Sequence, residues 1–144
     1  MGHGIKLTEI VEKMDLKNLT PEVELVDKEV NVPDVNRPAL QLAGFFDHFD
    51  SNRVQVIGNV EYRYVQTLTE ERQEYIYKKL LEHPIPCMVF CRDMEPSQEF
   101  LTLATEQGVP VFKTSKQTSD FTAEIIRWMN VRLAPCISIH GVLV

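Results

Sequence analysis

The sequence predicts an α/β fold in which a mostly parallel sheet carries helices on both faces. The clearest support is a strand–helix–strand unit, with two apolar runs at residues 87–91 and 109–112 on either side of a helical pattern. A crossover of this length favours two parallel strands joined by a right-handed connection. Strand and helix patterns continue to alternate through the C-terminal half, which is typical of α/β domains.

The N-terminal half contains shorter predicted elements. Residues 7–14 have the apolar spacing of an amphipathic helix. Residues 16–19 and 23–32 are predicted strands on either side of a Thr20-Pro21 turn, because apolar and charged residues alternate there. A short helix is expected from Pro38 to Gly44, followed by an apolar strand at residues 54–57.

Three longer helices are predicted in the C-terminal half. Thr69 is a good N-cap for a helix that ends before Pro84. Pro96 is expected to open the helix of the strand–helix–strand unit, and Gly108 to close it. The last helix is expected to start near Ser119 or Asp120 and to stop at Pro135.

Composition indicates one globular domain without a nucleic-acid or membrane surface. The 144 residues are 44% hydrophobic and 25% charged, with a net charge of −6. No run of basic residues is present, which disfavours nucleic acid and anionic membranes as partners. No stretch reaches membrane-spanning length, and the N-terminus lacks the apolar core of a signal peptide. A cytoplasmic location is therefore expected.

The cysteine pattern fits the same expectation. Cys87 and Cys91 lie in one predicted strand, which places their Cα atoms about 13 Å apart, whereas a disulfide tolerates about 7 Å. No further ligands are spaced nearby for a metal. We therefore expect no metal site, and we interpret both cysteines as buried small hydrophobic residues.

The sequence contains none of the common catalytic or phosphate-binding motifs. GxxxxGK[ST], GxGxxG and GxSxG are all missing from the 144 residues. Polar residues do follow the two strands of the strand–helix–strand unit, at the edge where ligands of open α/β sheets gather. Arg92, Thr114 and Ser115 are the candidates there for binding an anion. The alternative is that these are ordinary polar loop and helix-capping residues.

A second candidate region is the aromatic segment at residues 45–49. Phe45, Phe46 and Phe49 would form a contact patch for another subunit or domain if they were exposed. Core packing is the alternative, because Phe is normally buried. His48 is interpreted as a surface histidine.

Four segments, in order, resemble the HPr kinase/phosphorylase family. NRPALQLAGF at residues 36–45 resembles its RPxLxLAG(Y/F) segment, and CRDMEP at residues 91–96 resembles its RDLEP turn. VPVFKTS at residues 109–115 resembles the strand and turn that follow, and ISIHGVLV at residues 137–144 resembles the entry strand of its catalytic domain. The resemblance implies an N-terminal domain at residues 1–134 and the first strand of a kinase domain at residues 135–144, with the phosphate-binding loop beyond Val144.

The resemblance carries expectations about fold and activity. It implies a three-layer α/β/α domain similar to the N-terminal domain of muramyl-peptide ligases. It also implies a homohexameric parent enzyme that uses ATP or pyrophosphate with Mg²⁺ to phosphorylate a serine of the phosphocarrier protein HPr, and that reverses this reaction with inorganic phosphate. ATP and Mg²⁺ would bind beyond Val144, so the chain alone is expected to be inactive.

His140 has a different interpretation with and without the resemblance. Taken alone, it is an ordinary strand histidine; the family match implies a place in the catalytic centre, near the phosphate loop. Two other functions stay open for the chain. It is either a stand-alone module that binds an anionic metabolite through Arg92 and Thr114, or an interaction domain that uses residues 45–49.

Overall fold

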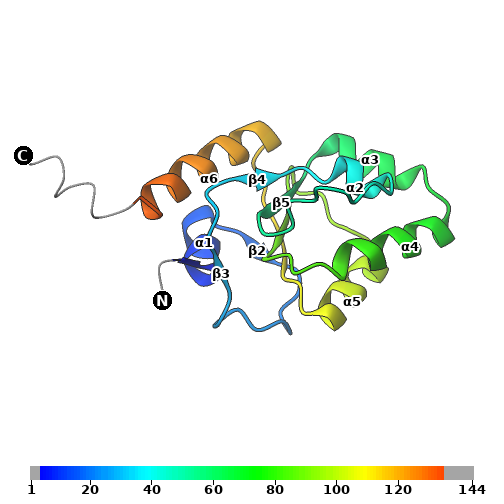
Figure 1. Ribbon diagram of the computed structural model, residues 1–144, viewed down its shortest axis with the longest axis horizontal. Helices are drawn as coiled ribbons and strands as arrows, with labels where there is room; N and C mark the ends of the chain where they lie inside the picture. Colours follow the sequence, from blue (N-terminus) through cyan, green and yellow to red (C-terminus); the bar gives the residue numbers. More distant parts are fainter. Residues whose placement is uncertain (1–3, 135–144) are drawn as a thin grey trace, which may run out of the picture.

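Short apolar runs form the strands of a central sheet in the computed structural model, which describes residues 4–134 (Figure 1). Four strands are parallel, and one edge strand is antiparallel to its neighbour. The order across the sheet is β2 (Lys17–Asn18), β7 (Val111–Lys113), β6 (Met88–Phe90), β5 (Val54–Ile57) and β4 (Val35–Asn36). The predicted parallel pairing of the two strands in the strand–helix–strand unit is confirmed, with Met88 opposite Val111.

Helices cover both faces of this sheet. On one face lie α1 (Leu7–Met14) and α6 (Thr118–Arg132), and on the other α4 (Glu70–Leu81) and α5 (Gln98–Gln107) (Figure 1). The short helices α2 (Ala39–Leu42) and α3 (Asn59–Gln66) lie on the α4–α5 side. Because side chains alternate along a strand, Val56 and Val89 pack towards α1 and α6, whereas Ile57, Met88 and Phe90 pack towards α4 and α5. The result is a sheet between two helical layers, as expected.

Helix ends follow local chemistry with small shifts from prediction. The Thr69 hydroxyl accepts a hydrogen bond from the Arg72 backbone N–H at 3.1 Å, as expected for an N-cap. For α5 the cap is Ser97 rather than Pro96, so that helix begins two residues later than its predicted opening. Gly108 ends α5 in the left-handed conformation, with φ 74°.

The predicted strand at residues 23–32 is largely wrong. Only β3 (Glu29–Val30) is a strand, and it pairs with β1 (Ile5–Lys6) in a separate two-stranded sheet that was not predicted. Val23 is buried while its backbone N–H donates to Thr20 in a turn. The alternation therefore reflects burial of single side chains in an irregular segment, not a ladder of paired strands.

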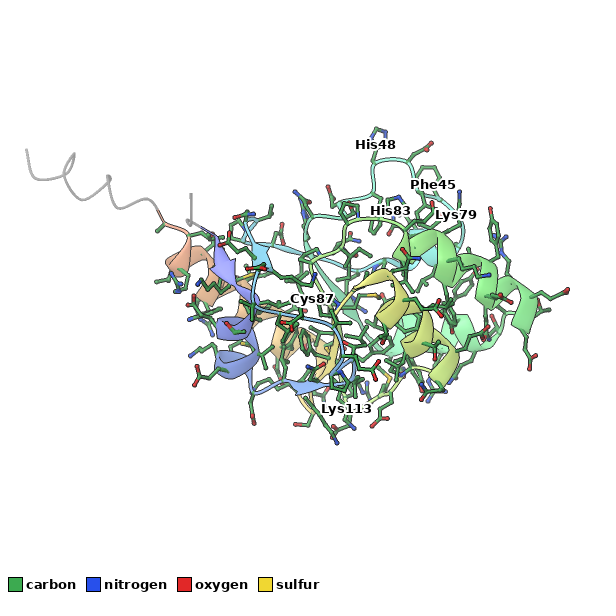
Figure 2. The ribbon with its side chains drawn as sticks, turned by 90° about the horizontal axis from the view of Figure 1, so that it is seen from below. Phe45, His48, Lys79, His83, Cys87 and Lys113 are labelled. Atoms are coloured by element: carbon green, nitrogen blue, oxygen red, sulfur yellow. The ribbon has the colours of Figure 1, made fainter. Side chains whose placement is uncertain are left out.

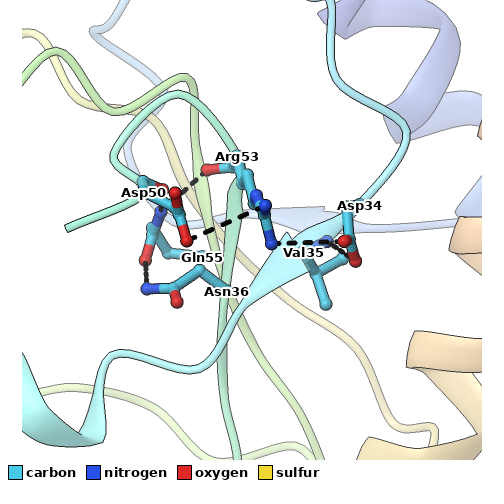
Figure 3. A network of polar contacts seen from close by, with 6 residues as sticks. All are labelled: Asp34, Val35, Asn36, Asp50, Arg53 and Gln55. Carbon is cyan, nitrogen blue, oxygen red and sulfur yellow. Dashed lines mark hydrogen bonds and ion pairs between the residues drawn. The ribbon is translucent and has the colours of Figure 1, made fainter. Parts of the chain in front are cut away.

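Two further elements escaped prediction, and each has a physical reason. β4 is only two residues long, and side-chain contacts join it to β5 (Figure 3). Asn36 donates to the amide oxygen of the fully buried Gln55 at 2.7 Å, and Arg53 donates to Asp34 at 3.2 Å. α3 packs only two apolar side chains against the core, the partly buried Tyr62 and Val65, and its single buried residue is Glu61. Within residues 4–134, no helix is both long and apolar enough to cross a membrane.

Candidate functional site

The two loops that follow β6 and β7 meet at the carboxyl edge of the sheet. From β6 the chain continues to α5 on one face, and from β7 to α6 on the other, so the strands diverge at a topological switch point. The Arg92 backbone N–H donates to the Lys116 carbonyl at 2.9 Å, and the Asp93 N–H donates to the Thr114 carbonyl at 2.8 Å. Both Arg92 and Asp93 have positive φ, 61° and 58°. The loops are thus joined by their backbones.

The three predicted ligand-binding residues have different surroundings in these loops. The side chains of Arg92 and Ser115 are exposed. Thr114 is buried, and its hydroxyl accepts a hydrogen bond from the Lys116 backbone N–H at 3.2 Å. The structure therefore brings the three residues to one edge of the sheet. The Thr114 hydroxyl, however, already accepts a hydrogen bond within the turn of its own loop.

The positive charge of Lys113 at this edge is largely compensated. Its ammonium group pairs with Glu95 and lies 4.0 Å from a carboxylate oxygen of Asp93. The hydrogen bond with Glu95 raises the pKa of Lys113, and the same contact lowers the pKa of Glu95. Among the cationic side chains of the two loops, Arg92 is thus better placed than Lys113 to meet an added anion.

A neighbouring ion pair at the same edge was not predicted. Arg37, directly after β4, donates from Nε and Nη2 to the two carboxylate oxygens of Glu61, at 3.1 and 2.8 Å. Glu61 is only 4% exposed and also accepts the Gly58 backbone N–H at 2.8 Å, which caps the start of α3. The spacing of Gly58 and Glu61 is that of a capping box, a signal that was available in the sequence.

Gly58 is required at this position because other side chains lie close to its Cα. A Cβ atom there would lie 2.6 Å from Nη2 of Arg37 and 2.8 Å from the hydroxyl oxygen of Thr118. Gly58 thereby lets the first turn of α3, the start of α6 and Arg37 converge on one point.

The two strand cysteines are buried, as predicted. Cys87 and Cys91 are free and fully buried, on the face that packs against α1 and α6. Burial raises the pKa of Cys87 to about 12 and that of Cys91 to about 11. Neither is a reactive thiolate at neutral pH. Among residues 4–134, no three His, Cys, Asp or Glu side chains gather as a metal site would require.

The aromatic segment divides between core and surface. Phe46 stacks on His83 with ring centroids 5.3 Å apart, and Phe49 meets the same ring edge-on at 5.0 Å. Both are partly buried and pack against the core on the α4–α5 side of the sheet, which is closer to the core interpretation than to an exposed patch. Phe45 is 48% exposed and His48 is also exposed, at the edge of the molecule opposite Lys113 (Figure 2). The proposed catalytic residue His140 lies outside the described residues.

Comparison with known proteins identifies the family. A family model described as the HPr serine kinase N terminus matches residues 5–129. Curated relatives named HPr kinase/phosphorylase include one from Lachnoclostridium phytofermentans, 56% identical over 99% of this chain and 46% of its own length. Another, from Caldicellulosiruptor bescii, is 36% identical over 94% of this chain and 43% of its own length. The chain thus spans less than half the length of these relatives.

A solved structure supports the fold alone. The CBS and DRTGG domains of the regulatory region of a Clostridium perfringens pyrophosphatase, in complex with the activator diadenosine tetraphosphate, match with a TM-score of 0.60 at 16% identity. The match covers 88% of this chain and 48% of that one. The expected likeness to muramyl-peptide ligases stays a prediction. From the family match and the relatives, the chain belongs to the family of HPr serine kinase N-terminal domains.

Proposed function

We propose that this chain is the N-terminal, non-catalytic part of a bifunctional kinase/phosphorylase that acts on a serine of the phosphocarrier protein HPr in carbon catabolite repression. The observation that carries the proposal is the 56% identity with an HPr kinase/phosphorylase over nearly the whole chain but less than half of that relative. Residues 1–134 form the N-terminal domain in this proposal, with a regulatory or supporting role, and residues 135–144 begin the kinase domain.

The residues of this chain do not fit ATP and Mg²⁺. Phosphoryl transfer requires a cradle for the β- and γ-phosphates and acidic ligands for the metal they share. The sequence contains no GxxxxGK[ST] loop, and residues 4–134 contain no cluster of acidic and histidine side chains for a metal. The proposal therefore assigns both cofactors to residues beyond Val144. His140 would join that centre, and the parent enzyme would be a cytoplasmic homohexamer.

Kinase activity of matched chains tests this function. The isolated 144-residue chain is expected to transfer no phosphate from Mg-ATP to HPr, whereas the full-length protein is expected to phosphorylate it. A full-length His140→Ala variant is expected to lose most of this activity while keeping its oligomeric state. Turnover by purified 144-residue chain would contradict the proposal, and so would a fully active His140→Ala protein.

A binding function at the carboxyl edge is the second candidate. It is favoured by the backbone-joined loops that hold Arg92 and Ser115 exposed at the switch point. Titration with inorganic phosphate, sugar phosphates and uridine nucleotides is expected to shift the amide NMR signals of Arg92, Thr114 and Ser115. An Arg92→Ala variant should lose these shifts, while Arg127→Ala, an exposed cation of α6 away from the pocket that Arg92 lines, should keep them. A titration without shifts at Arg92 or Thr114 rejects this function.

A further inference from the structure

A cavity of about 210 Å³ lies between the sheet and helices α3, α4 and α5. Its floor is formed by the side chains of β5 and β6 that face these helices, and its walls come from the three helices. Its lining includes Tyr62, Val65, Gln73, Tyr77, Phe90 and Phe100. Glu95, Pro96 and Ser97, from the loop that also carries Arg92, complete one side of it.

Four aromatic rings from four different elements line this cavity. Tyr62 of α3 meets Phe90 of β6 with centroids 6.4 Å apart at 86°, and Phe90 meets Phe100 of α5 at 5.8 Å and 72°. Phe100 in turn meets Tyr77 of α4 at 5.0 Å and 80°. Each contact is edge-to-face, the arrangement that the ring quadrupoles favour. A planar guest ring would find both ring edges and ring faces along these walls.

The polar groups of the lining are oriented by bonds to the backbone. The amide nitrogen of Gln73 donates to the carbonyls of Val65 and Leu68, at 2.9 and 3.1 Å. The group that Gln73 has left to offer a guest is therefore its amide oxygen, an acceptor. Tyr62 donates its hydroxyl to the Glu95 carbonyl at 2.8 Å, which fixes the position of its ring.

The charges around the cavity select against an anion. No Lys or Arg lines it, and its two carboxylates, Glu61 and Glu95, already pair with Arg37 and Lys113. A phosphate or carboxylate placed here would lose its hydration without gaining a cation. The guest that fits is uncharged.

We propose that this cavity binds a small, uncharged aromatic compound of one ring or two fused rings that carries a hydrogen-bond donor. The size is suitable, because an apolar protein cavity of about 150 Å³ already holds benzene. The donor would meet the amide oxygen of Gln73, and the ring would extend the edge-to-face contacts of Tyr77 and Phe100. This site adjoins the anion site considered above, because Tyr62 and the loop from β6 to α5 border both, but it takes a different class of ligand and goes beyond the proposed kinase function.

Amide NMR titration of the 144-residue chain with phenol and with indole tests the proposal. Saturable shifts are expected around Tyr62, Val65, Tyr77 and Phe100, with nuclear Overhauser contacts from probe protons to the rings of Phe100 and Tyr62. Cyclohexanol, similar in size to phenol but without an aromatic ring, should bind more weakly. Inorganic phosphate should leave these signals in place.

Two tryptophan variants on one helix provide the matched control. Val65→Trp would fill the cavity from α3 and should abolish probe binding, whereas Val60→Trp, at a position 69% exposed outside the cavity, should retain it. Probe shifts that survive in a folded Val65→Trp chain would overturn the proposal. If that variant fails to fold, the nuclear Overhauser contacts between the probes and the unmodified chain decide the question. The absence of saturable shifts with both phenol and indole would then refute the site. Since no phosphoryl transfer is measured, the outcome is independent of kinase activity.

Discussion

The two faces of the central sheet are built from alternate residues of the same strands, yet they pack differently. Towards α1 and α6 the strands present Val56, Val89 and the fully buried Phe112, and the 15-residue helix α6 packs over them. Towards α4 and α5 they present Met88 and Phe90, which border the cavity, and Phe90 meets aromatic rings of α3 and α5. The difference indicates one face that supplies stability and one that has room for a ligand.

The largest expected effect compares one phenylalanine from each face. Phe121 of α6 is fully buried on the α1–α6 side of the sheet, and Phe100 of α5 is 3% exposed beside the cavity. Phe121→Ala should lower the free energy of unfolding by about 3–5 kcal/mol. Phe100→Ala should lower the free energy of unfolding by a smaller amount, because a ring that borders a cavity makes fewer contacts that the substitution can remove. Urea unfolding followed by circular dichroism measures both changes in the free energy of unfolding. If Phe100→Ala destabilised the protein as much as Phe121→Ala, or more, the proposed difference between the two faces would be wrong.

The next prediction concerns the buried ion pair beside the cavity. Glu61→Ala removes the partner of Arg37 and the cap of α3, and should destabilise the protein by roughly 2–3 kcal/mol. Glu61→Gln keeps an acceptor for the Gly58 N–H and should cost less. Glu74→Ala, which breaks the exposed pair with Lys78, is the control and should change stability little. A Glu61→Ala protein as stable as the control would refute this role.

Helix capping differs between the faces and gives a smaller effect. On the cavity side, Thr69 caps α4 through its side chain, so Thr69→Ala should cost about 1 kcal/mol. On the other face the N-cap residue of α6, Gln117, makes no side-chain hydrogen bond to the helix, so Gln117→Asp should stabilise the protein by up to about 1 kcal/mol. The melting temperature should therefore fall for Thr69→Ala and rise for Gln117→Asp. A lower melting temperature for Gln117→Asp would argue against an uncapped α6.

The smallest effect is electrostatic and depends on pH. The contact with Lys113 lowers the pKa of Glu95, so its contribution to stability is present above the unfolded pKa of Glu, about 4.3, and is lost as pH falls through the lower folded pKa. Because Lys113 has a raised pKa, its contribution is present below the unfolded pKa of Lys, about 10.4, and is lost as pH rises through the higher folded value. Glu95 is half exposed, so solvent screens the contact and the energies are small.

Carboxyl NMR titration measures the Glu95 shift directly. In a Lys113→Met variant the Glu95 pKa should rise towards that of an ordinary Glu. An unchanged Glu95 pKa in the variant would show that the Lys113 contact does not exist in solution.

Prediction from sequence succeeded where the signal lies within one element. The strand at residues 54–57, the Thr69 cap and the Gly108 stop each depend on a few adjacent residues, and the structure shows all three. It failed where partners are distant in the chain. Arg37 and Glu61 are separated by 24 positions, and the strand predicted at residues 23–32 had the right alternation but a pairing partner for only two residues.

The candidate sites show the same division. Placing Arg92, Thr114 and Ser115 at one edge required only that consecutive parallel strands end together, which the sequence pattern determines. That the Thr114 hydroxyl is bonded within its own loop, and that Lys113 is compensated by Glu95, depend on side-chain geometry that no local pattern encodes. No sequence pattern predicted the cavity. Its four aromatic rings come from separate elements that only the fold brings together: Tyr62, Tyr77, Phe90 and Phe100.

By itself, the sequence determined the α/β class, the parallel strand pair, most of the helices and the family, since periodicity, capping residues and ordered motifs are properties of neighbouring residues. Only the tertiary structure decided the strand order, the convergence of Arg37, Gly58 and Thr118, and the unequal packing of the two faces. These depend on which side chains meet after the chain has folded, and the volume they leave empty is a property of the whole assembly rather than of any segment.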